Sequence, residues 1–460
     1  MRRMTILRTD MEIDMTKGSP FKLIIRFLIP IVLGNVIQQL YNLADSIIVG
    51  RYVGADALAA VGATGTIMFL IIGFMNGMTS GFAVVTAQRF GAGDEEGVRR
   101  SVCSAIILSA ATTVLLTAVS LIGMRGLLKL MNTPDDVFEM SFTYIFTICA
   151  GLIFTALYNL TAALLRAVGN SRIPLLFLAV AAGINVALDL ILIINYNMGV
   201  FGAALATILS QGLSGIACMI YIFAKVPVLS PRREDWEHAK EHMRLQVNIG
   251  IPMALQFSVT AIGTVIVQSA LNTLGSVVMA SYTASQKVEQ LLTMPFQGMG
   301  VAMATYAGQN RGIADYGRIK RGVFDAAIMT VVYGAVIAAI LIPTPQYTIP
   351  LFVTEDPTAM IEWAKIYFRI CPLFYIPLGL IFVYRNALQG MGYSVTTLLG
   401  ALIELVSRII FAIIAVRRES YAGVCFANAI AWLSAGVLLL FCFEVIIRRQ
   451  LKTPKATAGL

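Results

Sequence analysis

Charged residues and histidine are scarce in this chain. Asp, Glu, Lys and Arg make up only 13% of its 460 residues and histidine occurs twice, whereas 58% of the residues are hydrophobic and the mean hydropathy is +0.80. Ordinary soluble domains carry roughly 25% charged residues. The composition therefore excludes an ordinary soluble domain and indicates a protein that crosses a membrane many times.

The chain also lacks the motifs of common catalytic and metal sites. It contains no DDxxD, HExxH or GxSxG sequence, and neither histidine lies in an apolar run. The six cysteines lie in or at the ends of apolar runs without a CxxC pair, which is typical of small buried side chains rather than disulfides or metal ligands. We therefore expect a protein that is not an enzyme and needs no cofactor.

Apolar runs of about 20 residues recur along the whole chain, and each is long enough to cross a bilayer core of about 30 Å. We predict an all-α integral membrane protein with twelve transmembrane helices. The runs cover approximately 24–48, 57–88, 101–124, 138–160, 173–194, 200–224, 246–271, 277–308, 322–342, 361–388, 395–416 and 422–447.

The two halves of the chain resemble each other. The pair Ile29–Pro30 recurs at Ile251–Pro252, and Gly169-Asn-Ser aligns with Gly392-Tyr-Ser. Six spans in each half return the chain to its starting side, so the repeat is parallel, and such repeats place the substrate between them. The predicted parts are an N-terminal lobe (1–225), a cytoplasmic linker (226–245), a C-terminal lobe (246–447) and a cytoplasmic tail (448–460).

The net charge of +9 does not indicate a nucleic-acid partner, because 25 of the 34 Lys and Arg lie around the start of the first span, on alternate connections between the spans and in the tail. This asymmetry follows the positive-inside rule and predicts that both termini are cytoplasmic. The linker is the most polar internal segment. Its His238 and His242 stand four apart and could hold a metal, but we expect a solvated amphipathic helix at the membrane surface.

Four acidic residues stand out within the apolar runs: Asp45, Asp189, Glu289 and Glu404. A carboxylate at the centre of a membrane helix costs about 2.5–3.5 kcal/mol on insertion scales. Glu404 and Arg408 are four apart on one helical face, so we interpret them as a structural ion pair. Glu289 has no basic residue on its own face, and both a structural and a functional role are open for it.

Asp45 and Asp189 have no basic partner within reach on their own spans. Further polar side chains lie at helical spacing from them or on the sixth span: Gln38, Tyr41, Asn185 and Thr207. If these helices adjoin, their oxygens can hold a shared proton or a Na⁺ ion. The alternative is two separate structural Asp residues. Because unpartnered acids inside a membrane are functional by default, we favour a cation site.

Several stretches resemble the multidrug and toxic compound extrusion (MATE) family, in particular its DinF-type branch. They are IPIVLGNVIQQLYNLADSIIVGRYVGADALAAVG, TAQRFGAGD, ALLRAVGNS and NVALD. The resemblance covers essentially the whole chain. It implies a pair of six-helix bundles and a cation-coupled antiporter that exports cationic or amphipathic organic compounds in exchange for H⁺ or Na⁺.

The resemblance also implies a cation site in the N-terminal lobe. The matching residues are Asp45, Asn185, Asp189 and Thr207. Pro30 matches the first-span proline of that branch, and a proline inside a helix leaves a carbonyl unpaired and permits a bend. Another branch, the NorM type, carries acidic residues on spans seven and ten. The bodies of these spans contain none here, so coupling through the C-terminal lobe is not expected, and Glu404 lies outside either pattern.

A lipid-linked oligosaccharide flippase of the same superfamily is the alternative function. Such a protein must hold a pyrophosphate and should line its cavity with Arg and Lys, whereas basic residues are few inside the spans here. The expected partners are small organic molecules, most of them cationic, and the lipid bilayer. We expect a monomer in the cell inner (plasma) membrane.

Overall fold

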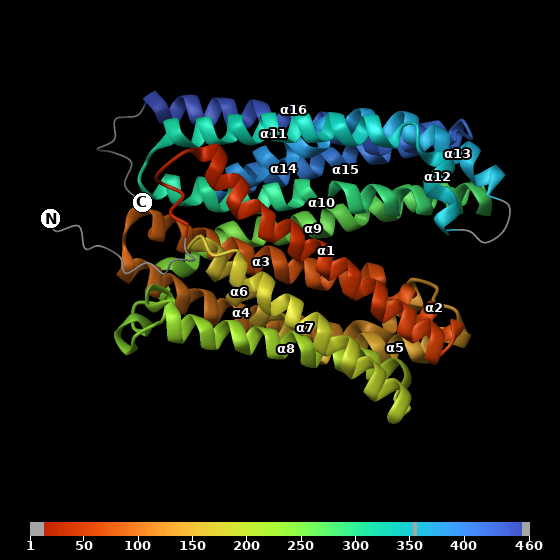
Figure 1. Cartoon of the computed structure of the whole chain (residues 1–460), viewed down its shortest axis with the longest axis horizontal. Helices are drawn as coiled ribbons and strands as arrows, with labels where there is room; N and C mark the ends of the chain where they lie inside the picture. Colours follow the sequence, from red (N-terminus) through yellow and green to blue (C-terminus); the bar gives the residue numbers. More distant parts are fainter. Residues whose placement is uncertain (1–12, 353–356, 453–460) are drawn as a thin grey trace. The chain divides into compact units, whose positions relative to one another are not determined.

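The computed structural model describes residues 13–352 and 357–452, and these residues form helices and turns without any strand (Figure 1). The chain divides into two compact units. Unit 1 comprises Met1–Met15 and Ile29–Phe257, and unit 2 comprises Thr16–Leu28 and Ser258–Leu460. The division falls inside two helices, α1 and α9, whereas the predicted lobe boundaries flank the linker 226–245.

Unit 1 contains most of α1 and the following helices as far as the first part of α9. The elements are α1 (Pro20–Tyr52), α2 (Ala55–Ala63), α3 (Gly65–Ala92), α4 (Glu95–Leu130), α5 (Asp135–Ala150), α6 (Leu152–Ala167), α7 (Arg172–Leu190), the π-helix η1 (Ile191–Asn195), α8 (Gly199–Lys225), the 3₁₀ turns η2 (Pro227–Leu229) and η3 (Arg233–Trp236), and α9 (Lys240–Asn272).

Unit 2 contains the rest of α9 and all later helices. These are α10 (Ser276–Gly312), α11 (Tyr316–Leu341), α12 (Pro345–Thr348), the 3₁₀ turn η4 (Ile349–Phe352), α13 (Thr358–Ile370), the 3₁₀ turn η5 (Cys371–Phe374), α14 (Tyr375–Gly390), α15 (Ser394–Arg417) and α16 (Tyr421–Lys452). The turn η5 interrupts the predicted tenth span and contains Pro372, whose backbone nitrogen has no hydrogen to donate.

The predicted fold class is confirmed. Each of the twelve predicted spans lies on one helix or on consecutive helical segments. Among the described residues, ten helices are long and apolar enough to cross a membrane, or eleven if α5 and α6, bent by 49°, form one span. The helix α10 covers the predicted eighth span but does not meet this test, because charged and amide side chains such as Lys287 and Glu289 interrupt it.

Large apolar side chains on α4 point away from the protein. Val114, Leu115, Val119 and Ile122 are all exposed, and Ile122 reaches 87%. A contiguous apolar surface of this kind is unfavourable in water but matches the hydrocarbon core of a bilayer. This face of α4 is therefore a lipid-facing surface.

Small residues hold the first part of α9 against α3 within unit 1. A Cβ atom on Gly81 would lie 2.4 Å from the Cα atom of Gly250, and one on Gly77 would lie 2.5 Å from the Cα atom of Ala254. Only residues without bulky side chains allow helix backbones to approach so closely. This contact explains why α9 begins in unit 1 although most of its predicted lobe lies in unit 2.

The linker differs from its prediction. No solvated amphipathic helix forms there; the segment consists of the short turns η2 and η3, followed by the start of α9. Asp235 is 4% exposed, pairs with Arg99 at 3.0 Å and accepts from the backbone of Arg232 at 2.7 Å. These bonds fix a tight turn and tether the linker to α4. Among the described residues no cluster of three His, Cys, Asp or Glu could hold a metal.

Candidate functional site

The predicted residues of the cation site come together in unit 1. The Tyr41 hydroxyl on α1 donates to the Thr207 hydroxyl on α8 at 3.2 Å, so these two helices adjoin at this level. Asp45, one turn further along α1, is 8% exposed, and Asp189 on α7 is completely buried. The carboxyls of Asp45 and Asp189 are close enough to interact electrostatically. The first, fifth and sixth predicted spans therefore meet at one buried polar cluster, which we call the carboxyl pocket.

The polar atoms of the carboxyl pocket lack partners. Among the described residues, Oδ1 of Asp45, both carboxyl oxygens of Asp189 and both side-chain polar atoms of Asn185 are buried without a hydrogen bond. Two ionised carboxylates are both acceptors, so they can bond to each other only through a proton or a shared cation. Buried polar atoms without partners cost about 1–3 kcal/mol each. The arrangement is therefore suited to take up a small positively charged ligand.

Apolar residues from five elements surround this pocket. The cluster includes Ile48 of α1, Ile193 of η1 and Val200 of α8. Tyr144 of α5, which sequence reasoning missed, is buried there and interacts electrostatically with Asp45 and Asp189. A low-dielectric shell strengthens every charge interaction inside it. The charge state of the carboxyl pair therefore has a large effect on the energy of unit 1.

A π-helical turn follows directly after the carboxyl pair. The helix α7 ends at Leu190, and Ile191–Asn195 continue as the π-helix η1. Single π-turns are rare in α-helices and are frequent at functional sites. No sequence signal identified this turn, since the run around it is apolar throughout.

Two residues predicted to support the site have different surroundings. The Gln38 amide donates to Asn42 on its own helix at 3.4 Å, and this is an exposed contact rather than part of the carboxyl pocket. Pro30 is buried inside α1, which continues through it as one helix. The division between the two units falls beside this proline, between Leu28 and Ile29.

Glu289 in unit 2 is buried, and one of its carboxyl oxygens accepts two hydrogen bonds. Its Oε2 atom accepts from the Tyr367 hydroxyl of α13 at 2.8 Å and from the Tyr375 hydroxyl of α14 at 3.1 Å. The two tyrosines flank the turn η5, so this carboxylate connects the two segments of the broken tenth span. Sequence spacing along α10 could not reveal these donors, because they come from other helices.

The ion pair predicted between Glu404 and Arg408 is present at 2.6 Å. A second guanidinium, that of Arg385 on α14, lies 3.0 Å from the other oxygen of Glu404. Arg408 also donates from Nε to Asn428 at 3.1 Å. Arg385 lies near the end of the predicted tenth span. Its position in an apolar run was the only sequence feature that could have indicated a buried partner for Glu404. We call Arg385, Glu404 and Arg408 the arginine cluster.

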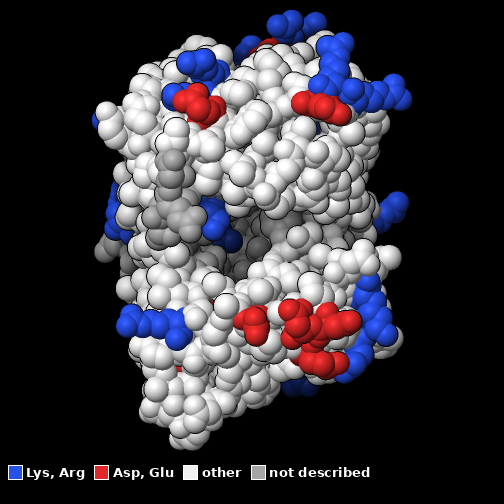
Figure 2. All heavy atoms as spheres, turned by 90° about the vertical axis from the view of Figure 1, so that its right-hand side faces the viewer, with Lys and Arg blue, Asp and Glu red and all other residues white. Residues whose placement is uncertain are grey.

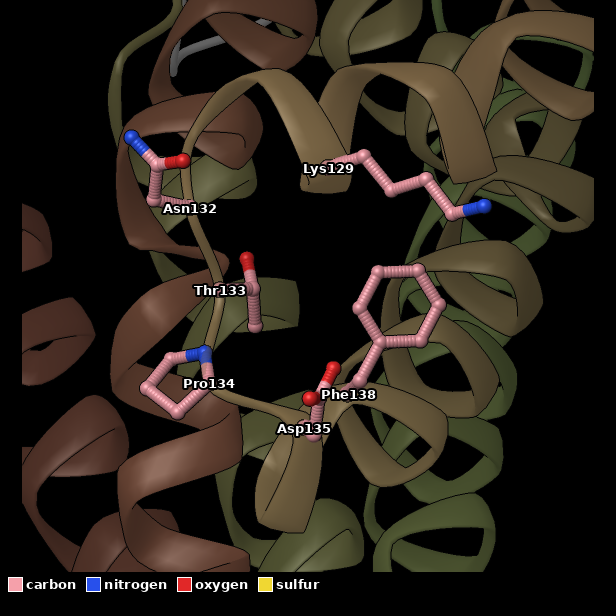
Figure 3. A pocket seen from close by; sticks show the side chains of 6 residues that line it. All are labelled: Lys129, Asn132, Thr133, Pro134, Asp135 and Phe138. Carbon is pink, nitrogen blue, oxygen red and sulfur yellow. The ribbon is translucent and has the colours of Figure 1, made fainter.

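A surface pocket in unit 1 lies apart from these residues. It is formed where α4 connects to α5, and its side chains surround an open recess (Figure 3). The lining residues are Lys129, Asn132, Thr133, Pro134, Asp135 and Phe138. On the face shown in Figure 2, acidic side chains gather in the lower half, and α5 contributes two acids in its first turn, Asp135 and Asp136. None of the predicted site residues lines this recess.

Comparison with known proteins gives a consistent result. The model of the MatE family matches residues 30–191 and again residues 252–414, which agrees with the internal repeat. Among curated proteins, the chain is 30% identical over 393 residues to a probable multidrug resistance protein of Bacillus subtilis (strain 168), YpnP, covering 85% of this chain and 87% of that protein. A second protein of the same organism, the probable multidrug resistance protein YoeA, is 28% identical over 353 residues, covering 75% and 76%.

Solved structures agree with this comparison. A transporter of the MOP superfamily from Pyrococcus furiosus superposes with a TM-score of 0.87 at 25% identity, covering 97% of this chain and 100% of that one. That protein is described as having a binding pocket of reverse polarity, which suggests a different function for it.

Proposed function

Because the chain belongs to the MatE family of multidrug and toxic compound extrusion transporters, we propose that it is a secondary antiporter that exports cationic or amphipathic organic compounds in exchange for H⁺ or Na⁺. One observation carries the coupling part of this proposal. The buried carboxyls of Asp45 and Asp189 are close enough to interact electrostatically, and among the described residues most of their oxygens lack a donor.

The carboxyl pair couples ion movement to conformation through its charge. With a proton or Na⁺ bound, the repulsion between Asp45 and Asp189 is relieved. For Na⁺, the oxygens of Asn185 and Thr207 complete the ligand set, as oxygen ligands do in other cation-coupled transporters. An ion shifts the equilibrium between inward-open and outward-open states only through its different affinity for the two states. The charged, empty pair then favours the state that takes up the organic compound.

The same proposal includes the orientation of the chain. We place it in the cell inner (plasma) membrane as a monomer. The distribution of basic residues supports a cytoplasmic position for both termini. Reporter tags placed after Met1 and after Leu460 should both give a cytoplasmic signal. A periplasmic signal from either tag would contradict the even number of spans and the shared orientation of the two halves.

Transport in inverted membrane vesicles tests the function. Uptake of a cationic dye, rhodamine 6G, is measured after a pH gradient or a Na⁺ gradient is imposed separately. We expect one of the two gradients to drive uptake well above that of vesicles without the protein. If neither gradient drives uptake while ATP does, the protein is not an ion-coupled antiporter.

A further inference from the structure

The arginine cluster of unit 2 contains one more positive charge than negative charge. Its two guanidiniums share the single carboxylate of Glu404, at 3.0 Å from Arg385 and 2.6 Å from Arg408. The side chains are 14%, 9% and 9% exposed for Arg385, Arg408 and Glu404. One carboxylate can neutralise only one guanidinium. The cluster therefore holds an unbalanced charge in a place that is largely screened from water.

The other contacts of these arginines do not remove the imbalance. Arg408 donates from Nε to the amide oxygen of Asn428, and Asn428 donates in turn to the Tyr282 hydroxyl at 2.8 Å. These partners are neutral. The Nε atom of Arg385 is buried and has no hydrogen-bond partner among the described residues. A buried charge without a counter-charge costs several kcal/mol, so a ligand of opposite charge would be bound favourably.

A glycine lets Arg408 pack against the backbone of α9. A Cβ atom at Gly263 on α9 would lie 2.7 Å from Nη1 of Arg408. This nitrogen is distinct from Nη2, which bonds to Glu404. Any other residue at position 263 would force the guanidinium to move. Position 263 therefore adds no side chain that could cover or pair with Nη1.

We propose that Arg385 and Arg408 form a binding site for the carboxylate or phosphate group of an amphipathic compound, with Glu404 holding the two guanidiniums in position. A guanidinium offers five N–H donors in a planar fork that matches these two anionic groups. The inference rests on the proposed function, because it assigns the class of cargo: organic compounds that carry an acidic group are accepted beside cationic ones.

Glu289 provides a control, because removing its charge should change anion binding in the direction opposite to that caused by removing an arginine. It lies in the same unit, and its negative charge interacts electrostatically with Arg408. Glu289 forms no ion pair with either arginine among the described residues, but its negative charge opposes the binding of a further anion at the cluster. Removing the charge of Glu289 should therefore strengthen binding of an anion, whereas removing the charge of Arg385 should weaken it. General structural damage would weaken binding in both variants.

The test measures the binding of two xanthene dyes of opposite charge to the purified full-length protein in dodecyl maltoside. Fluorescence anisotropy gives the dissociation constants of carboxyfluorescein, an anion, and rhodamine 6G, a cation. We expect Arg385→Gln to raise the dissociation constant of carboxyfluorescein about 10-fold relative to that of rhodamine 6G. Glu289→Gln should lower the dissociation constant of carboxyfluorescein roughly threefold. Arg385→Lys should bind carboxyfluorescein more tightly than Arg385→Gln does. Arg448→Gln, which removes a surface arginine that is 72% exposed, is the matched control.

Competition identifies the source of the anionic group. Displacement of carboxyfluorescein by 1-naphthoate supports a soluble acidic compound, and displacement by phosphatidylglycerol alone supports a lipid headgroup. The inference is overturned if wild-type protein binds rhodamine 6G but not carboxyfluorescein, or if Arg385→Gln and Arg448→Gln change carboxyfluorescein binding equally. Failure of the proposed function is a separate result, because it appears as the absence of gradient-driven rhodamine 6G uptake in vesicles.

Discussion

The two units differ in the partners of their buried carboxylates. In unit 1, Asp45 and Asp189 interact electrostatically with each other, and Asp189 has no donor to either of its oxygens among the described residues. In unit 2, Glu289 accepts from two tyrosines and Glu404 binds two arginines. Both units derive from one repeat, since the MatE model matches each half of the chain. A carboxylate with its donors in place is suited to hold helices together, whereas one without donors is suited to take up an ion.

The largest expected effect comes from removing the charge in unit 1. Asp45→Asn and Asp189→Asn keep nearly the same volume, and a neutral amide is cheaper to bury than a carboxylate. Both variants should fold at wild-type levels and still lose dye efflux to the level of cells without the protein. Efflux of rhodamine 6G is measured at matched protein levels, with Asp135→Asn as a control at the surface recess. Full efflux by Asp189→Asn would show that coupling resides elsewhere, with Glu289 or Glu404 the next candidates.

The same kind of change in unit 2 should damage folding first. Glu404→Gln leaves Arg385 and Arg408 without a counter-charge, and breaking a buried ion pair costs about 3–5 kcal/mol. We expect a lower thermal midpoint of the purified protein and a lower yield, opposite to the result in unit 1. Exchanging the residues (Glu404→Arg with Arg408→Glu) should restore part of the stability. If Glu404→Gln is as stable as the wild type yet inactive in transport, the structural role of this residue is wrong.

A smaller effect is expected from the neutral ligands of the carboxyl pocket. Asn185→Ala and Thr207→Ala weaken the site without removing its charge. Each should raise the cation concentration for half-maximal efflux by roughly threefold to tenfold, which corresponds to the loss of about one hydrogen bond or ligand. The measurement is dye efflux over a series of Na⁺ concentrations and pH values. A complete loss of efflux in either variant would contradict the expectation that these changes have smaller effects than Asp45→Asn and Asp189→Asn.

The smallest effects are expected when a single tyrosine hydroxyl is removed, one in each unit. Tyr367→Phe removes one of the two donors to Glu289 and should lower stability by about 1–2 kcal/mol. Tyr41→Phe removes only the bond to Thr207 and should alter cation affinity about threefold with little change in stability. Thermal unfolding and dye efflux are compared for both variants. Equal stability losses in the two would remove the distinction between the units.

Much of this arrangement was predictable from local sequence. Apolar runs located the spans, and helical spacing gave the pair Glu404–Arg408. The absence of basic neighbours singled out Asp45 and Asp189. These features depend on residues within one helix, where spacing fixes which side chains share a face.

The remaining features depend on packing between helices. Arg385 reaches Glu404 from a different helix, and Tyr144 reaches the carboxyl pocket from α5. The linker prediction was wrong because the shape of the linker depends on a buried ion pair between Asp235 and Arg99. These two residues lie far apart in the sequence. Branch membership, the choice between H⁺ and Na⁺ and the monomeric state stay predictions.

The central claim is that the carboxyl pair binds the coupling ion, and ion movement during transport tests it most directly. Purified protein is reconstituted into liposomes that contain a pH-sensitive or Na⁺-sensitive dye, and transport is started by adding rhodamine 6G. The account predicts substrate-dependent movement of one cation in the opposite direction for the wild type. It predicts no such movement for Asp45→Asn or for Asp189→Asn. Substrate-dependent counter-movement at the wild-type rate in Asp189→Asn would contradict the account.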